Sequence, residues 1–266
     1  MTMKPPPIWR DALALLSGRV VLAQLGLVTG LFLFFMLWLR LPDASILEVV
    51  GSGLLALLIV ASTGLGESWL ILGLAGRPRT WGRFIRGTLL LLVGVVLWIA
   101  WSVWLAHVSN DDPLRAGYLN SKAPHQLRRL LTYEHILLWL GWMWTTLKWL
   151  GGGLLASIIV PLVASRRPLR AALIAVRSLS FWLTLLAGTM FATLMTGALM
   201  AWLPLRGLWA EIFSLVLRLA VVVLLDGMIA CWLLATLAVC VRRADAGYAT
   251  PAGRPDDSQP QTVDTP

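Results

Sequence analysis

Long apolar stretches separated by short polar segments run through most of this chain. About 20 consecutive apolar residues cross the hydrocarbon core of a bilayer, and six stretches reach that length. We therefore expect an all-α integral membrane protein, a helical bundle of about six transmembrane helices. The predicted spans are residues 20–39, a span within 46–76, 87–106, a fourth span that ends near residue 165, 181–203 and 219–241.

Two of these spans have bounds that the pattern leaves open. The apolar stretch 46–76 is longer than a perpendicular span requires, so we expect its helix to tilt or break. The fourth span begins somewhere between Trp139 and Trp149. Outside the spans, residues 1–19 are predicted to form a cytoplasmic amphipathic segment. Residues 242–266 are rich in Pro, Asp, Gly and Thr and are predicted to form a disordered cytoplasmic tail.

The cationic residues are concentrated in alternate polar segments. The chain is 58% hydrophobic and only 13% charged, yet its net charge is +9. Short loops rich in Lys and Arg stay in the cytoplasm, so both termini are predicted to be cytoplasmic. The Arg-rich composition and compact loops favour a bacterial inner membrane. Because the cations flank the spans, where lipid phosphates lie, the expected partner is the phospholipid bilayer and not a nucleic acid.

Two basic segments lead into spans with their arginines on one helical face. In 166–178, "RRPLRAALIAVRS", four arginines fall within about 100° of a helix, and the segment 79–86 repeats the arrangement at i, i+4 and i+7. Both segments are predicted to be short interfacial helices. Plain anchoring and selective binding of a lipid are both open interpretations. The predicted headgroup anchors are Arg79, Arg83, Arg86, Arg166, Arg167, Arg170 and Arg177.

The order of basic lead-in, span and returning span recurs three times along the chain. The units are residues 8–76, 77–165 and 166–243, and they predict three helix-pair repeats. The first lead-in is the weakest copy, because Arg10 and Arg19 do not share a helical face.

A family resemblance rests on the third lead-in. Arg167, Arg170 and Arg177, with Leu169 and Leu173, precede a span in a way that resembles the membrane domain attached to some glycerophosphodiester phosphodiesterases. The resemblance covers most of the chain as a pattern of spans, and it implies a polytopic helical membrane domain. It implies no phosphodiesterase activity, because we find no such catalytic domain in the sequence.

Three ionisable residues lie inside predicted spans: Glu67, Lys148 and Asp226. A charge in the hydrocarbon region is costly, so each is a functional candidate. Glu67 lies roughly 15 Å along a helix from Arg77, near the middle of the membrane. Gly64 and Gly66 lower the helix propensity beside it. The carboxyl is either the proton- or cation-binding group of a broken helix, or a group hydrogen-bonded to a neighbouring helix.

Small residues and tryptophans in the spans have packing interpretations. Gly26 and Gly30 form a GxxxG pattern and Gly188 lies on a ridge of small residues, so close helix contacts are predicted there, within the chain or between copies. Seven tryptophans favour an aromatic belt at the outer membrane boundary, with ligand stacking as the second interpretation. They are Trp98, Trp101, Trp104, Trp139, Trp142, Trp144 and Trp149.

No pattern of catalytic or metal-ligating residues is present, so we expect no catalytic residues, no metal and no cofactor. The first functional hypothesis is therefore a non-catalytic membrane protein, either a subunit bound to a membrane-protein partner or to a second copy, or a lipid-associated scaffold. The second is a carrier or channel component that uses Glu67. A membrane enzyme ranks third, since its polar groups would have to assemble from separate spans.

The carrier hypothesis makes a prediction that can be checked by labelling. A carrier that uses both intramembrane carboxyls requires Glu67 and Asp226 to face one water-accessible cavity. Cysteines substituted at these positions should then both react with a water-soluble thiol reagent. Lack of reaction at either position would count against a shared cavity.

Overall fold

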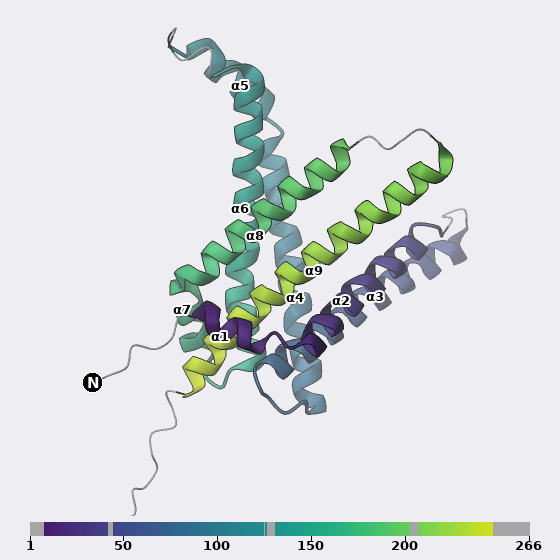
Figure 1. Cartoon of the computed structure of the whole chain (residues 1–266), viewed down its shortest axis with the longest axis vertical. Coiled ribbons are helices and arrows are strands. Elements are labelled where there is room, and N and C mark those ends of the chain that lie inside the picture. Colours follow the sequence, from purple (N-terminus) through teal and green to yellow (C-terminus); the bar gives the residue numbers. More distant parts are fainter. Residues whose placement is uncertain (1–7, 42–44, 125, 127–130, 203–206, 247–266) are drawn as a thin grey trace, which may run out of the picture.

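Residues 8–41, 45–124, 126, 131–202 and 207–246 are described by a computed structural model of the chain. All regular elements within these ranges are α-helices (Figure 1). They are α1 (Ile8–Leu15), α2 (Gly18–Trp38), α3 (Ile46–Leu74), α4 (Trp81–Ser109), α5 (Asp112–Lys122), α6 (Tyr133–Ala164), α7 (Pro168–Arg177), α8 (Leu179–Ala201) and α9 (Leu208–Ala246).

Six of the described helices are long and apolar enough to cross a membrane: α2, α3, α4, α6, α8 and α9. The prediction of an all-α membrane protein with six spans is thereby confirmed. Several helices extend past the predicted span bounds. α6 begins at Tyr133, before the predicted range for its start, and α9 runs from Leu208 to Ala246, so the boundary predicted at residue 242 falls inside a helix. Residues 203–206 and 247–266 lie outside the described ranges.

The second unit differs from the other two in how its basic lead-in is built. In the first and third units the lead-in is a separate helix, α1 or α7. In the second, Arg83 and Arg86 belong to the first turns of α4, so residues 81–86 are continuous with the span instead of forming a separate helix, and Arg79 precedes the helix. Each predicted unit nevertheless contains one pair of long helices: α2 with α3, α4 with α6, and α8 with α9.

Local sequence fixes how α3 begins and ends. Ser45 and Glu48 form a capping box: the Ser45 hydroxyl accepts from the Glu48 amide at 3.3 Å and the Glu48 carboxylate from the Ser45 amide at 2.9 Å. At the other end Gly76 has a φ of +68°, which glycine adopts without steric cost. The Arg77 amide there donates to the Leu72 carbonyl at 2.8 Å, closing a Schellman-type turn.

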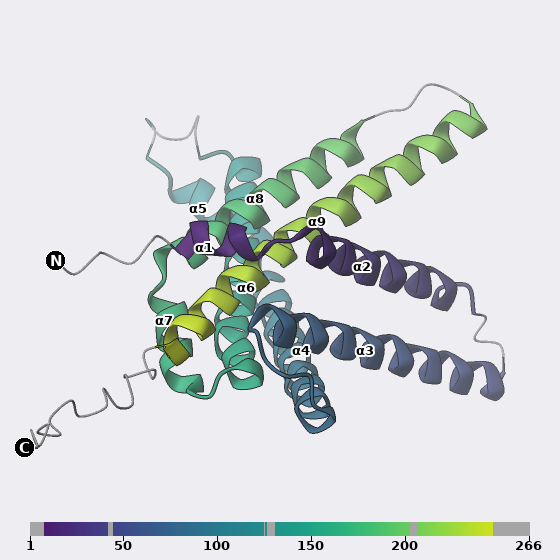
Figure 2. The ribbon, with the colours of Figure 1, turned by 60° about the horizontal axis from the view of Figure 1, so that its bottom comes forward.

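The helix pairs diverge from one end of the molecule, where α1 and α7 also lie; we call this end the base (Figures 1 and 2). α1 packs on α9, and α7 packs on α6 and α9. The main hydrophobic core lies at the base, and Ala171 and Ala175 bring α7 close to it without any exposed surface of their own. The core consists of Ile71, Ala75, Val160, Ala164, Ala171, Ala175, Phe181, Leu237, Cys240, Val241 and Ala244.

Away from the base, the long helices present large apolar side chains to their surroundings, as at Leu54, Val96 and Phe213. Such a surface is stable only in contact with hydrocarbon. The helices are also long: the 39 residues of α9 extend about 58 Å, compared with a hydrocarbon core of roughly 30 Å. Tilted helix pairs are therefore compatible with crossing a bilayer.

A polar cluster at the base joins both ends of the second unit to the start of the third unit and to the end of α9. The Arg77 guanidinium pairs with the Asp245 carboxylate, and its Nε donates to the Ala164 carbonyl at 2.9 Å. The Asp245 carboxylate also accepts from the Ser165 hydroxyl and the Arg166 amide, both at 3.2 Å. We call Arg77, Ser165, Arg166 and Asp245 the base clamp. It connects the 76/77 and 165/166 unit boundaries to the end of α9.

Two sequence predictions about the spans need correction. The helix α3 is continuous through Gly64 and Glu67, so the break considered there is absent. Residues 242–246, assigned to a disordered tail, are helical, and Asp245 among them takes part in the base clamp. The tail was predicted from composition. Composition does not reveal that the Asp245 side chain pairs with the mostly buried Arg77 side chain.

The base clamp predicts a large loss of stability on changing Asp245 to Ala. The side chains of Arg77 and Asp245 are only 15% and 16% exposed, so Asp245→Ala leaves a mostly buried guanidinium without its carboxylate. We expect a loss of roughly 2–4 kcal/mol, measured by reversible unfolding in detergent.

The matched control is Asp11→Ala, which removes the more exposed pair between Asp11 and Arg243, at 2.6 Å. That variant should lose less than about 1 kcal/mol. Equal losses in the two variants would contradict the role given to the base clamp.

Candidate ligand pocket between the helix pairs

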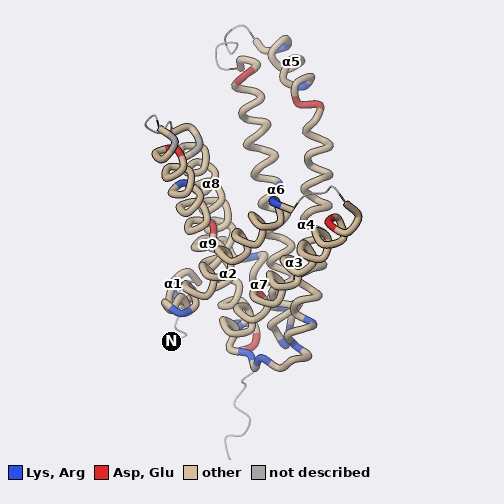
Figure 3. Tube along the Cα trace, turned by 90° about the vertical axis from the view of Figure 1, so that its right-hand side faces the viewer, with Lys and Arg blue, Asp and Glu red and all other residues tan. Residues whose placement is uncertain are grey.

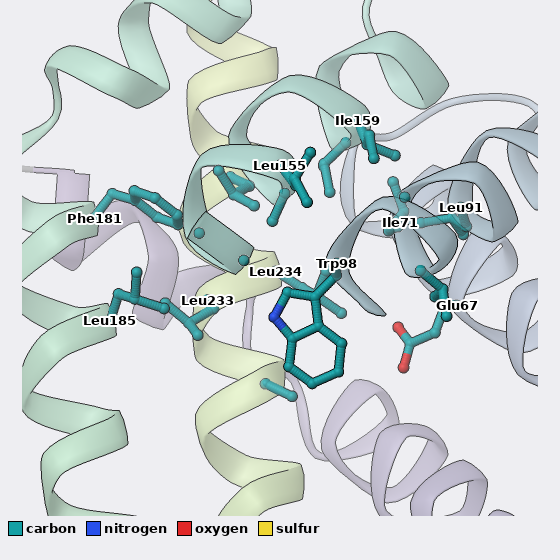
Figure 4. A pocket seen from close by; sticks show the side chains of 18 of the residues that line it. Glu67, Ile71, Leu91, Trp98, Leu155, Ile159, Phe181, Leu185, Leu233 and Leu234 are labelled. Atoms are coloured by element: carbon teal, nitrogen blue, oxygen red, sulfur yellow. The ribbon is translucent and has the colours of Figure 1, made fainter. Parts of the chain in front are cut away.

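A pocket of about 380 Å³ lies where α3, α4, α6, α8 and α9 converge (Figure 4). Residues of the base core, among them Ile71, Val160 and Phe181, form part of its wall. The lining side chains are apolar with three exceptions, which are the carboxyl of Glu67 and the indoles of Trp98 and Trp149. The pocket therefore suits a hydrocarbon chain better than a polar metabolite.

Glycines on α4 and α6 shape the pocket wall. A Cβ at Gly94 would overlap the Ile159 side chain, and a Cβ at Gly153 would overlap that of Leu185. A Cβ at Gly152 would lie 2.9 Å from the Trp98 indole nitrogen. Without side chains at these positions, neighbouring helices approach closely and large side chains lie against bare backbone.

Glycines also fix the surroundings of Glu67. A Cβ at Gly66 would overlap Leu27 of α2, and one at Gly64 would lie 2.9 Å from the Thr88 methyl group of α4. Gly64 and Gly66, which suggested a helix break in the sequence, are therefore the positions at which α3 accepts its two neighbours. The close approach of α2 brings the Gln24 side chain to Glu67.

Gln24 is the partner of Glu67 in the described structure. Its Nε2 donates to Oε1 of Glu67 at 2.9 Å, and the residue is only 1% exposed. The Oε1 atom of Gln24 is buried and has no hydrogen-bond partner among the described residues. No ion pair of the described residues involves Glu67. The pocket thus contains one carboxyl that is hydrogen-bonded on one oxygen and has no cation beside it.

Trp98 places an aromatic face in the same pocket. Figure 4 shows its indole and the Glu67 carboxyl side by side among apolar side chains. The Lys148 ammonium lies 5.1 Å from the Trp98 ring centroid, a cation–π distance. The ring centroids of Trp98 and Trp149 are 6.0 Å apart. Lys148, one of the three predicted candidates, therefore contacts a lining residue without lining the pocket itself.

Asp226 is exposed and does not line the pocket that contains Glu67. It precedes the lining residue Ala230 by four positions and so lies one turn away on the same face of α9. The structure brings Glu67 together with Gln24 and Trp98 but not with Asp226. A carrier that uses both carboxyls would need a pocket lined by both Glu67 and Asp226. Neither of the described pockets is lined by both residues.

The predicted packing glycines divide into two groups. Gly188 of α8 lies against Ile229 of α9, with 2.9 Å between a Cβ built at Gly188 and the Ile229 side chain. In contrast, no described atom comes within 4 Å of a Cβ at Gly26 or Gly30. The GxxxG face of α2 therefore has no neighbour inside the described chain.

The predicted headgroup anchors gather at the base, where Lys and Arg residues are concentrated (Figure 3). Arg83, Arg86, Arg166, Arg170 and Arg177 are exposed there, and Arg167 is half-buried. Arg79 is engaged within the chain, because its guanidinium lies 3.8 Å from the ring centroid of Trp69.

The helix α7 combines its arginines with an exposed apolar side. Leu169 is 80% exposed and Leu173 is also exposed, although both are large apolar residues. The opposite face is buried through Ala171 and Ala175. This arrangement is the one expected for a helix that lies at a membrane interface.

Sequence reasoning missed Gln24 and did not single out Trp98. Gln24 is an amide in the apolar stretch 20–39, and that was a usable signal, since an amide in hydrocarbon needs a partner. Trp98 was one of seven tryptophans attributed to an aromatic belt. Sequence spacing does not distinguish a tryptophan that faces a pocket from one that faces lipid.

Comparison of the chain with family models, with curated proteins and with solved structures finds no match. The resemblance to the membrane domain of glycerophosphodiester phosphodiesterases thus stays a prediction. The described residues contain no group of three or more His, Cys, Asp or Glu side chains that could hold a metal ion. What the fold defines is an integral membrane protein in which six of the described helices are long and apolar enough to cross the bilayer.

The Gln24–Glu67 contact predicts a double-mutant effect. Gln24→Leu leaves the Glu67 carboxyl without its partner, so the variant should lose about 1–3 kcal/mol of unfolding free energy in detergent. The double variant Gln24→Leu/Glu67→Leu removes both polar groups and should recover most of that loss. A Gln24→Leu protein as stable as the wild type would show that the contact contributes nothing.

Proposed function

We propose that this integral membrane protein is non-catalytic and lipid-associated, and that it holds a hydrocarbon chain between its three helix pairs. The observation that carries the proposal is the pocket of about 380 Å³ whose lining is apolar except for Glu67 and two indoles. Its volume falls in the range of small-ligand sites. An apolar cavity does not hold water well, so a lipid chain is its natural occupant.

The surface of the base supports association with lipid headgroups. Arg166, Arg170 and Arg177 are exposed beside the exposed side chains of Leu169 and Leu173. Phosphates would meet the arginines while the leucines enter the interface. In this proposal the base faces the cytoplasm of a bacterium, because short Arg-rich segments remain on that side of the inner membrane.

A scaffold or subunit role would also need a surface for another protein. Gly26 and Gly30 of α2 are the positions for such a contact, since no described atom covers them. A membrane-protein partner or a second copy of the chain could pack there through close backbone contact.

A carrier or channel component is the second candidate, and the Gln24–Glu67 contact is the observation that favours it. A membrane-buried carboxyl hydrogen-bonded across two helices is a feature of proton- and cation-coupled carriers. A carrier must open alternately to both sides, and here Ile71, Val160 and Phe181 pack into the base core. We therefore rank lipid binding first, and a membrane enzyme below both.

Filling the pocket tests the proposed function. Ala230 of α9 lines the pocket, so Ala230→Phe should occupy the space of a bound chain. Loss of contact with two buried CH₂ groups costs about 1.6 kcal/mol, more than a tenfold decrease in affinity. Native mass spectrometry of the full-length protein with added dioctanoyl phosphatidylglycerol would measure the change.

The matched control is Ala220→Phe, the same substitution on the same helix at an exposed position outside the pocket. It should bind the lipid as the wild type does. Equal lipid binding by the wild type and Ala230→Phe, with both proteins folded, would refute the pocket as the site.

A further inference from the structure

Glu67 is the one ionisable side chain among the residues that line the pocket. It comes from the middle of an apolar span, where a carboxylate without a counter-charge is costly. Gln24 supplies a single neutral hydrogen bond to Oε1, and Oε2 has no hydrogen-bond partner among the described residues. The pocket therefore pairs a hydrocarbon-lined space with one incompletely satisfied acid.

We propose that the pocket binds a cationic amphiphile, a long-chain amine in its protonated form, with Glu67 as the counter-ion of the ammonium group. This inference rests on the proposed function and names the chemical class of the ligand. The alkyl chain would occupy the apolar part of the pocket. The ammonium group would donate to the Glu67 carboxylate.

The aromatic rings of the site fit an organic cation. The lining contains three aromatic rings, those of Trp98, Trp149 and Phe181, and an alkylammonium is attracted to an aromatic face. Gln24 orients the carboxyl from the neighbouring helix α2, where its side chain is fully enclosed. Gln24 is accordingly a positioning residue for Glu67.

The same residues do not suit a metal ion. Calcium takes six to eight oxygen ligands, and magnesium requires octahedral coordination. The lining offers two oxygens from one carboxyl, and the adjacent amide oxygen of Gln24 is buried away from the pocket surface. An alkylammonium needs only one strong acceptor when the rest of the molecule is hydrocarbon.

Lys148 is a cation in contact with the pocket lining, because its ammonium lies 5.1 Å from the Trp98 ring centroid. It makes no ion pair with Glu67 in the described structure. If Lys148 governed selectivity, the pocket would prefer an anionic chain. The experiment therefore includes a carboxylate with a chain of matched length.

The test compares three ten-carbon ligands on the full-length protein in neutral detergent at pH 7: n-decylamine, n-decanol and n-decanoate. Binding is measured as the concentration dependence of thermal stabilisation. We expect the amine to bind about tenfold or more tightly than the alcohol, because it adds a charge-assisted hydrogen bond in a desolvated site. Glu67→Gln should abolish this preference. Glu211→Gln, which removes an exposed carboxyl outside the pocket, should keep it.

A second measurement uses only the wild-type protein, so it does not depend on the folding of a variant. Dicyclohexylcarbodiimide, a hydrophobic reagent that modifies membrane-buried carboxyls, is added and the loss of the unmodified Glu67 peptide is followed by mass spectrometry, so that coupling of the amine to the activated carboxyl also counts as modification. Decylamine should slow this modification, whereas decanol at the same concentration should slow it much less.

The outcomes separate this inference from the proposed function. Three results would overturn the inference and leave a chain-binding pocket. They are equal binding of amine and alcohol, tightest binding of decanoate, and an amine preference that survives Glu67→Gln. Absence of binding by all three ligands would overturn the inference and the chain-binding function together.

Discussion

The ion pair between Arg77 and Asp245 joins segments that are 168 residues apart in the sequence, and the divergent arrangement depends on it. The long helix pairs pack on one another chiefly near the base, so their relative directions are set there. Ser165 and the Arg166 amide bring the second unit boundary to the same carboxylate. A single acidic side chain at the end of α9 thus holds both ends of the second unit and the start of the third, while Ala171 and Ala175 let α7 close the core beneath them. The base clamp is partly exposed, so its charged groups lie at the ends of the spans, where the chain leaves the hydrocarbon region.

Much of the fold was predictable because the bilayer imposes its own constraints. Apolar stretches of sufficient length have to be helices, and hydropathy therefore located all six. The ends of the helices were less predictable. Asp245 was placed in a disordered tail because the sequence around it is polar, and only the position of Arg77 in space reveals its partner. Similarly, Gly64 and Gly66 are compatible with a broken helix or with close neighbours, and helix propensity alone does not decide between them.

Of the candidate site, the sequence predicted Glu67 but not the residues around it. Glu67 stood out by the cost of a charge in a span, and so did Asp226, but the structure places only Glu67 in the pocket. Which way a transmembrane helix rotates about its axis depends on its neighbours, and a single sequence does not contain that information. For the same reason the contact between Gln24 and Glu67 was not foreseen, although each residue is visibly polar in an apolar stretch. The pocket itself arises from Gly94, Gly152 and Gly153, whose missing side chains have no signature in hydropathy.

The divergence of the helix pairs has a consequence for the two leaflets of the membrane (Figure 1). At the base the protein meets lipid along one compact boundary. Farther along α2, α4 and α8 the pairs separate, so lipids between two pairs have protein on both sides. The perimeter in contact with lipid is therefore longer in the leaflet away from the base. Changes in the chain length or saturation of that leaflet would act on the separation of the helix pairs, whereas equal changes in the other leaflet would act on the packed core at the base.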